Sequence, residues 1–183
     1  ILIQYFPMYL IKSNNEFYLH KIYDFLTQKK IPILLDGNKK AYGVLRLEFF
    51  DKSLKVQFNE DKLLFDLPLN IEHFFHEIYY LLSENFVQVG ELTYYPIKEL
   101  ISKKNVSVSL RNTHNLIFNQ ALINNHGGVL KTDLYNLIWP SDTDIHINKL
   151  DTHLTNLKNF MKKELNYDLK FISNHGMIQF LLD

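Results

Sequence analysis

The chain from about residue 86 to residue 183 changes its hydrophobic period twice, which leaves few folds open to it. Short runs with apolar residues at every second position come first and predict β-strands. Three stretches with helical spacing follow, and the longest covers residues 148–165. Two final apolar runs within residues 170–182 flank Asn174-His175-Gly176 and predict a β-hairpin. Strands, three helices and a closing hairpin, in this order, predict an α+β winged helix-turn-helix.

The helix over residues 148–165 has two chemically different faces. Four apolar residues lie at positions i, i+4, i+7 and i+11 and predict a buried stripe: Leu150, Leu154, Leu157 and Met161. The opposite face and its borders carry hydroxyl, amide and ammonium groups: Lys149, Thr152, Thr155, Asn156, Lys158, Asn159, Lys162 and Lys163. Asn can pair with adenine, Thr can contact a thymine methyl group, and Lys can neutralise phosphates. Double-stranded DNA is one interpretation of this face, and an ordinary solvated polar face is the other.

Three segments of this half are similar to motifs of one known family. Val89-Gly90-Glu91-Leu92 is similar to the family's opening strand, and residues 134–139 to its second helix, which ends in an apolar residue and Trp. Residues 150–158 align with the family's V-D-V-H-I-S-R-L-R, with Asp, His and the core Leu in register. Residues 86–182 thus resemble the OmpR/PhoB family of winged-helix response-regulator effector domains. This resemblance implies a DNA-binding transcriptional regulator.

The same resemblance implies which residues contact DNA. By position in the family they are Lys149, Thr152, His153, Thr155, Asn156 and Lys158 on the helix, and Ser173 and His175 on the wing. Thr155, Asn156 and Lys158 stand where the family usually carries Arg, and the wing lacks the family's T-V-R-G-x-G-Y sequence. We therefore expect weak phosphate affinity. Obligate dimerisation, a narrow operator preference, or a protein-interaction module that has lost DNA binding would each fit this pattern.

The first half of the chain predicts an α/β arrangement with two helices. Ser13-x-x-Glu16 has the spacing of a capping box and precedes the first helix. The apolar run at residues 31–35 predicts a buried strand, and residues 71–82 have the spacing of an amphipathic helix. The polar Ser83-Glu84-Asn85 follows, so we expect two domains, residues 1–85 and 86–183.

Parts of this first half resemble a receiver domain. Ile1-Leu2-Ile3 is similar to the first receiver strand, and Asp66-Leu67-Pro68-Leu69 to the segment before the last helix. However, Gln4-Tyr5 stands where an acidic pair would hold Mg²⁺, and Leu67 where a Lys would pair with a phosphoryl group. Asp36 ends an apolar run as a phosphoacceptor does, but its Asp-Gly context fits a turn better. Since 85 residues are also too few for five strand-helix units, the resemblance implies a reduced, degenerate, phosphorylation-independent receiver-like domain.

The helix over residues 71–82 carries more aromatic residues than one core face requires. In the resembling family the last receiver helix commonly forms a two-fold interface. The resemblance therefore implies a homodimer contact through Phe74, Phe75, Tyr79 and Tyr80. The alternative is that both faces of this helix are covered within the monomer.

Composition argues against several kinds of site. The chain has no Cys, which excludes disulfides and thiolate chemistry, and its 20 basic and 20 acidic residues give no global attraction to nucleic acid. His73, His76 and Glu77 lack the H-E-x-x-H spacing, so we interpret them as surface residues and expect no metal. Since the sequence also lacks a phosphate-binding loop and a nucleophile elbow, we expect neither an enzyme nor a cofactor.

The N-terminal apolar run is too short to span a membrane. Residues 1–7 have no basic segment before them, and Lys12 interrupts the apolar stretch. We therefore expect a cytoplasmic protein without membrane contact. Its expected partners are double-stranded DNA, a second copy of the chain, and RNA polymerase or another regulator.

Overall fold

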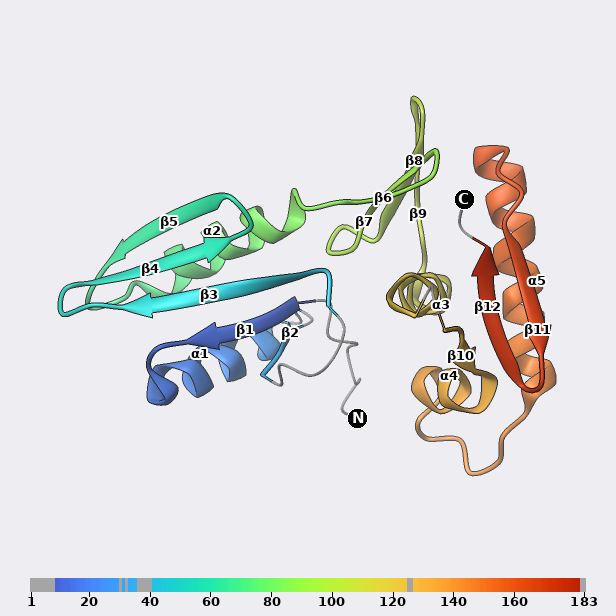
Figure 1. The fold of residues 1–183 in the computed structure, drawn as a ribbon, viewed down its shortest axis with the longest axis horizontal. Coiled ribbons are helices and arrows are strands. Elements are labelled where there is room, and N and C mark those ends of the chain that lie inside the picture. The colour runs from blue at the N-terminus through green and yellow to red at the C-terminus, as the bar shows by residue number, and fades with distance from the viewer. Residues whose placement is uncertain (1–8, 30, 32, 36–40, 125–126, 182–183) are drawn as a thin grey trace. The chain divides into compact units, whose positions relative to one another are not determined.

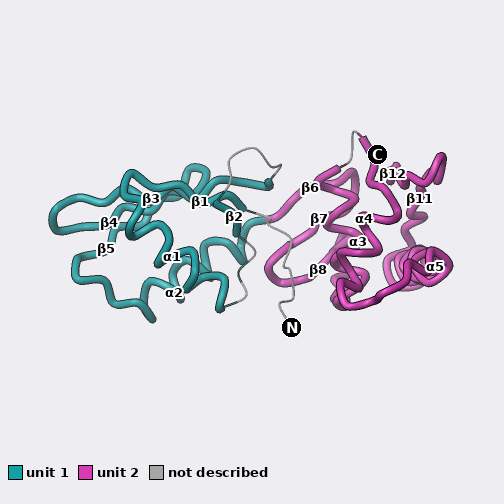
Figure 2. Tube along the Cα trace, turned by 90° about the horizontal axis from the view of Figure 1, so that it is seen from below, with its two compact units in different colours: residues 1–85 teal, residues 86–183 magenta. Residues whose placement is uncertain are grey.

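The chain forms two compact units, Ile1–Asn85 and Phe86–Asp183, hereafter unit 1 and unit 2 (Figure 2). The computed structural model describes residues 9–29, 31, 33–35, 41–124 and 127–181. Unit 1 is built around one mixed sheet with two helices, and unit 2 around three helices with two smaller sheets (Figure 1). The fold is thus a mixed α/β unit followed by a winged-helix-like unit.

Unit 1 contains five strands and two helices in its described residues: β1 (Tyr9–Ser13), α1 (Glu16–Gln28), β2 (Ile33–Leu34), β3 (Gly43–Phe49), β4 (Ser53–Phe58), β5 (Asp61–Asp66) and α2 (Ile71–Ser83). The strands lie in the order β2-β1-β3-β4-β5. β1 runs parallel to both β2 and β3, whereas β3, β4 and β5 form an antiparallel meander. The parallel part is therefore confined to three strands.

This sheet differs from that of a receiver, in which all five strands are parallel. Only three residues separate β3 from β4, and only Asn59 and Glu60 separate β4 from β5. Connections this short can join antiparallel strands but cannot cross over to a parallel one. The β1-α1-β2 segment shares a parallel strand pair with a receiver, and the β3-β4-β5 segment contradicts the receiver resemblance.

Three of the receiver correspondences fall on residues that the structure does not describe. The strand expected at Ile1-Leu2-Ile3 and the phosphoacceptor candidate Asp36 both lie outside the described residues. The first described strand is β1, and the residues that follow it are Asn14 and Asn15. Gln4-Tyr5, which the resemblance puts in the place of an acidic pair, also lies outside the described residues.

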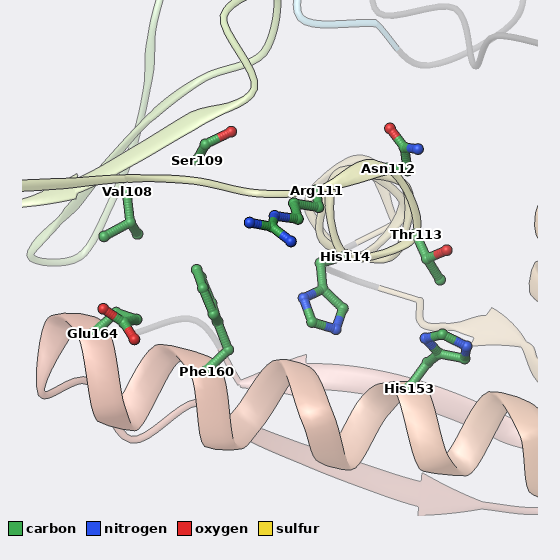
Figure 3. Close-up of a pocket in the computed structure, with 9 residues that line it drawn as sticks. All are labelled: Val108, Ser109, Arg111, Asn112, Thr113, His114, His153, Phe160 and Glu164. Atoms are coloured by element: carbon green, nitrogen blue, oxygen red, sulfur yellow. The ribbon is translucent and has the colours of Figure 1, made fainter.

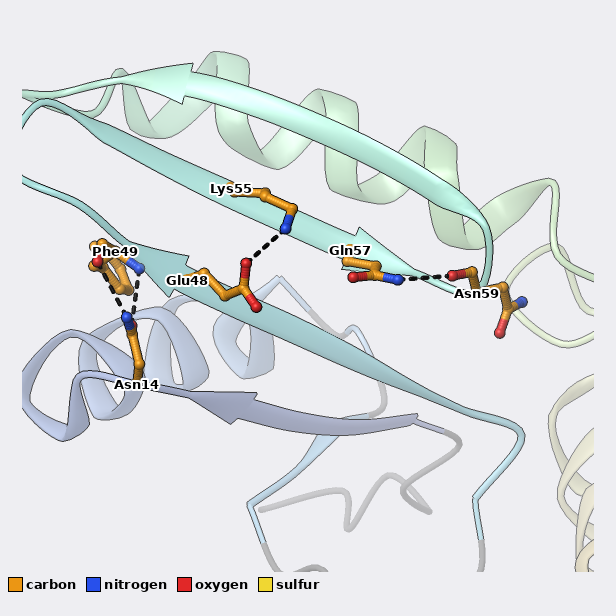
Figure 4. Close-up of polar contacts among 6 residues, drawn as sticks. All are labelled: Asn14, Glu48, Phe49, Lys55, Gln57 and Asn59. Atoms are coloured by element: carbon orange, nitrogen blue, oxygen red, sulfur yellow. Dashed lines mark hydrogen bonds and ion pairs between the residues drawn. The ribbon is translucent and has the colours of Figure 1, made fainter.

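The start of α1 is fixed by asparagines rather than by a capping box. Ser13 still belongs to β1, so the N-cap falls on Asn15, whose side chain accepts a hydrogen bond from the Tyr18 backbone N–H at 3.2 Å. Asn14 bonds with its side chain to both the backbone N–H and the carbonyl of Phe49 (Figure 4). These bonds tie the β1-α1 turn to the end of β3.

The core of unit 1 lies between one face of the sheet and the two helices. Alternate residues of β3 and β4 are buried, and so are the inner residues of α1 and α2: Leu45, Leu47, Leu54, Val56, Phe58, Ile22, Leu26, Phe74, Ile78 and Leu82. The other face of the sheet is polar, and Lys55 there pairs with Glu48 at 2.7 Å (Figure 4). The period-two pattern of β3 and β4 thus produces a sheet with one covered face.

Unit 2 contains two antiparallel sheets and three helices in its described residues: β6 (Val87–Val89), β7 (Leu92–Tyr95), β8 (Leu100–Lys103), β9 (Val106–Ser109), α3 (Asn112–Ile123), β10 (Val129–Leu130), α4 (Lys131–Ile138), α5 (Ile147–Leu165), β11 (Lys170–Asn174) and β12 (Met177–Leu181). Strands β6 to β9 form one sheet in sequence order. The hairpin β11–β12 forms the other sheet together with β10.

The predicted helices and hairpin of unit 2 agree with the structure apart from their ends. α4 begins at Lys131, directly after β10, with Leu130 in the N-cap position. The apolar stripe of α5 is confirmed, because Leu150, Leu154, Leu157 and Met161 are almost completely buried. They pack in one cluster with residues of α3, α4 and the hairpin, among them Phe118, Leu134 and Phe180. The opposite face of α5 is therefore left for solvent or a partner.

The part of the chain that the structure describes contains neither a membrane-spanning helix nor a cluster of metal-binding side chains. No helix there has the length and hydropathy of a membrane span. No group of three or more His, Asp or Glu side chains there could hold a metal ion. His73 and His76 are both exposed on α2, and the ring of His73 lies against Phe65.

Candidate nucleic-acid interface

The longest described helix of unit 2, α5, has a polar exposed face opposite its buried stripe. The helix has 19 residues and is therefore about 28 Å long. Its outward positions are occupied by short polar side chains and by lysines, all exposed: Asn148, Thr152, Thr155, Asn156, Lys158, Asn159, Lys162 and Lys163. Together these residues form the face that we call the α5 polar face.

The two threonines of the α5 polar face have their hydroxyl hydrogens engaged. Thr152 Oγ1 donates to the Asn148 carbonyl at 2.8 Å, and Thr155 Oγ1 donates to the Asp151 carbonyl at 2.9 Å. Such bonds to the preceding turn are common for Thr in helices. Each threonine therefore presents a methyl group and an acceptor oxygen outward, which suits a thymine methyl or a base amino group.

Two of the three asparagines on this face, Asn156 and Asn159, lie in the middle of the helix. Neither the Asn156 nor the Asn159 side chain forms a hydrogen bond there. A free carboxamide can donate and accept at once, which is the pairing that an adenine edge offers in the major groove. Asn156 and Asn159 are therefore the side chains of α5 best suited to read a base.

Lys149 is engaged inside unit 2. Its ammonium lies 2.9 Å from Asp142 Oδ2 and 4.1 Å from the centre of the Trp139 ring. Tyr135 donates its hydroxyl to the same carboxylate oxygen at 2.6 Å. These two hydrogen bonds lower the pKa of Asp142, while burial and the bond to Asp142 raise the pKa of Tyr135. Lys149 thus neutralises a carboxylate of the α4–α5 loop and is a poor candidate for a phosphate contact.

His153 lies on the flank of α5 and not on its polar face. The ring is half-buried, and its centre is 5.2 Å from that of Trp139 and 6.4 Å from that of His114 on α3. Seven positions separate it from Phe160, which lies on the same flank. The family position implied a DNA contact for His153, whereas its observed neighbours are α3 and the end of α4.

Asp151, which is in register with the family motif, links two helices. Lys131 at the start of α4 reaches its Oδ1 at 2.6 Å. The Lys131 backbone N–H also donates to the Gly176 carbonyl at the tip of the hairpin, at 2.8 Å. Lys131 therefore joins α4, α5 and the wing, a role that the sequence pattern did not reveal because its two partners lie 20 and 45 positions away.

The wing is a tight hairpin with exposed side chains at its tip. Asn174 pairs with Met177, so the loop consists of His175 and Gly176, with φ angles of 49° and 75°. Two positive φ angles are typical of a type I′ turn. Ser173 and His175 are both exposed, which leaves these predicted wing contacts available to a partner.

The charge of α5 is positive once its internal pairs are counted. Lys149 is neutralised by Asp142, and Lys163 lies 3.1 Å from the neighbouring Glu164. Lys158 and Lys162 form no ion pair with any described residue. Two free cations beside the asparagines make a modest attraction for phosphates, in keeping with the lack of arginine on this helix.

The predicted dimer residues of α2 fall into two groups. Phe74 is fully buried, with its ring centre 5.2 Å from that of Phe65, so it is a core residue and the prediction of an interface role for it is wrong. Like Ile78 and Leu82, it lies on the buried side of α2. Phe75 is half-buried against Phe25, whereas Tyr79 and Tyr80 are 43% and 66% exposed and remain free for a partner.

The order of a small antiparallel sheet, three helices and a hairpin paired with a short strand defines unit 2 as winged-helix-like. No model of a known protein family matches the sequence, and no curated protein matches it. Among solved structures, the chain is similar to the DNA-binding domain of CadC from E. coli, with 13% identity and a TM-score of 0.45. The similarity covers 55% of this chain and 95% of that chain.

Proposed function

We propose that the chain is a DNA-binding transcriptional regulator that inserts α5 into the major groove and lays the hairpin β11–β12 on the adjacent backbone. The observation that carries this proposal is the α5 polar face, on which Asn156, Asn159, Lys158 and Lys162 have no partner among the described residues and lie opposite an almost completely buried stripe. A helix presented in this way fits the major groove, which is about 12 Å wide.

The roles within this interface follow from the chemistry of each side chain. Asn156 and Asn159 would read adenine edges, and Thr152 and Thr155 would contact thymine methyl groups. Lys158 and Lys162, with Ser173 and His175 of the wing, would contact phosphates. With so few cations, affinity would depend on base contacts and on binding as a dimer more than on charge.

We further propose that the regulator is an atypical, phosphorylation-independent relative of the OmpR/PhoB response regulators. In this proposal unit 1 acts as a dimerisation module through Tyr79, Tyr80 and the outer side of Phe75, and neither unit is catalytic. The exposure of the two tyrosines supports the dimer contact. The parallel pairing of β1 with β2 supports the relation to response regulators. The meander of β3 to β5 makes unit 1 distinct from a receiver, so its input would not be phosphoryl transfer.

The test is binding of the purified chain to a pool of genomic DNA fragments at several salt concentrations. Asn156→Ala is expected to lose the selective retention, because about 1–3 kcal/mol of base discrimination is removed. Asn105→Ala, which changes an exposed asparagine between β8 and β9, is the matched control and is expected to bind like the wild type. If no fragment is retained even at low salt, the proposal fails, and a winged-helix module for protein contacts becomes the better account.

A further inference from the structure

A cavity of about 670 Å³ lies within unit 2, between α5 and the segment that joins β9 to α3 (Figure 3). Its principal walls are formed by Val108, Arg111, His114, His153, Phe160 and Glu164. Pockets for small molecules usually measure about 300–1,000 Å³, so the size is suitable for a ligand. The α5 polar face points elsewhere, and the proposed DNA interface does not use this cavity.

The middle of the cavity is apolar. Phe160 rises from α5 toward the opposite wall, and Val108 descends from β9 beside it (Figure 3). Both side chains are half-buried, and the Phe160 ring lies 5.8 Å from the His114 ring, centre to centre. A partly open aromatic surface next to an aliphatic one suits a flat hydrocarbon ring.

Arg111 supplies the cationic group of the cavity. It is one of two arginines in the chain, and its side chain forms no ion pair or hydrogen bond with any described residue. Its guanidinium extends over the space above Phe160 (Figure 3). The planar fork of an arginine matches a carboxylate, with which it forms two parallel hydrogen bonds.

Glu164 supplies an acceptor at the far side. It lies one helical turn beyond Phe160, on the side away from the two histidines (Figure 3). Its only ion-pair partner among the described residues is Lys163, at 3.1 Å, whose own side chain is 83% exposed. Such an exposed pair is weak, so a ligand donor can replace it. The carboxylate also disfavours a multiply charged anion such as phosphate.

We propose that this cavity binds a small aromatic carboxylate. Its carboxylate pairs with Arg111, its ring packs on Phe160 and Val108, and a hydroxyl or amino group across the ring donates to Glu164. This class of ligand follows from the order of groups along the cavity: a cation at one side, an apolar middle and a carboxylate at the other side. The site is separate from the proposed DNA function, since it requires neither a duplex nor the α5 polar face.

The test uses the full chain without DNA and 4-hydroxybenzoate as the probe, with binding followed by titration calorimetry and by NMR of the histidine ring protons. Saturable binding with a shift of the His114 signal is expected, and the signal is assigned with a His114→Gln variant. Arg111→Gln is expected to weaken binding about tenfold or more, because a charge-assisted hydrogen bond is lost. Arg46→Gln, which changes the other arginine on the polar face of unit 1, is expected to bind like the wild type.

Two further probes identify the groups of the ligand. The neutral analogue 4-hydroxybenzamide is expected to bind about tenfold more weakly than 4-hydroxybenzoate. Glu164→Gln is expected to reduce the preference for 4-hydroxybenzoate over benzoate, and thermal melting checks that each variant is folded. The proposal is overturned if 4-hydroxybenzoate shows no saturable binding at millimolar concentration, or if Arg111→Gln binds it as well as the wild type does. Loss of DNA retention by Arg111→Gln with no effect on 4-hydroxybenzoate also overturns it, because Arg111 is then a phosphate contact.

Discussion

The ammonium group of Lys149 lies 2.9 Å from the carboxylate of Asp142, so the first lysine of α5 is neutralised by the loop that precedes the helix. The same ammonium stands over the Trp139 ring, which favours this position further. A cation held by two intramolecular partners releases few counterions when DNA binds. Lys149 and Lys158 therefore differ in what they can contribute to a complex, although both are lysines of one helix.

This difference predicts unequal salt dependence for two variants. Lys158→Ala is expected to reduce the slope of log K against log salt by about 0.9, the value for one phosphate contact on B-DNA. Lys149→Met, which removes the charge but keeps a long unbranched side chain, is expected to leave the slope unchanged. The measurement is fluorescence anisotropy with a retained fragment between low and moderate salt. An equal reduction of the salt slope in both variants would show that Lys149 leaves Asp142 to bind a phosphate.

A second prediction concerns the wing turn. Gly176 has a φ of 75° and open space around its Cβ position, so a side chain there meets no atom but strains the backbone. Gly176→Ala is expected to lower the free energy of unfolding by about 1–2 kcal/mol. Gly127→Ala is the matched control, because Gly127 also has open space but no positive φ. Chemical denaturation of both variants checks this, and equal stability of the two would contradict the type I′ turn.

The structure agrees with the sequence where a pattern is local and departs from it where partners are remote. The stripe from Leu150 to Met161 and the extent of α2 follow from helical periodicity alone. The roles of Lys149 and His153 depend on contacts with Asp142, Trp139 and His114. These residues lie outside α5, so the helical periodicity of α5 does not reveal the contacts. Phe74 shows a related limit, because aromatic excess on a helix does not reveal which ring faces the core. Unit 1 shows a further limit of prediction from the sequence: whether its strands run parallel or antiparallel depends on which segments pair, and this pairing is not visible in the pattern of a single strand.

A third prediction concerns pH. Burial, and in second place the nearby His153, lowers the pKa of His114 below the ordinary 6.5. The unfolded chain therefore binds a proton at this site more readily than the folded chain does. Stability from this group is complete above pH 6.5 and is lost as the pH falls from there toward the folded-state pKa. His114→Gln is expected to flatten this part of the stability profile.

The measurement is the free energy of unfolding of the wild type and of His114→Gln at several values between pH 8 and pH 5. The difference between the two proteins cancels the other titrating groups, including Glu99, whose pKa is raised by burial. His175→Gln is the control, because that histidine is exposed on the wing. A wild type and a His114→Gln variant with parallel profiles would contradict the burial of His114.

The last prediction concerns assembly through α2. Tyr80 is 66% exposed and Tyr79 43%, and both follow Phe75 on the outer side of the helix. Exposed aromatic rings of this kind are enriched where proteins associate. Tyr80→Glu is expected to weaken dimerisation of the full chain by about tenfold or more, because a buried carboxylate without a partner is costly. Phe17→Glu changes an equally exposed ring on α1 and is expected to leave the dimer intact. Sedimentation velocity over a range of concentrations distinguishes the two variants, and a wild type that is monomeric throughout would exclude α2 as a dimer interface.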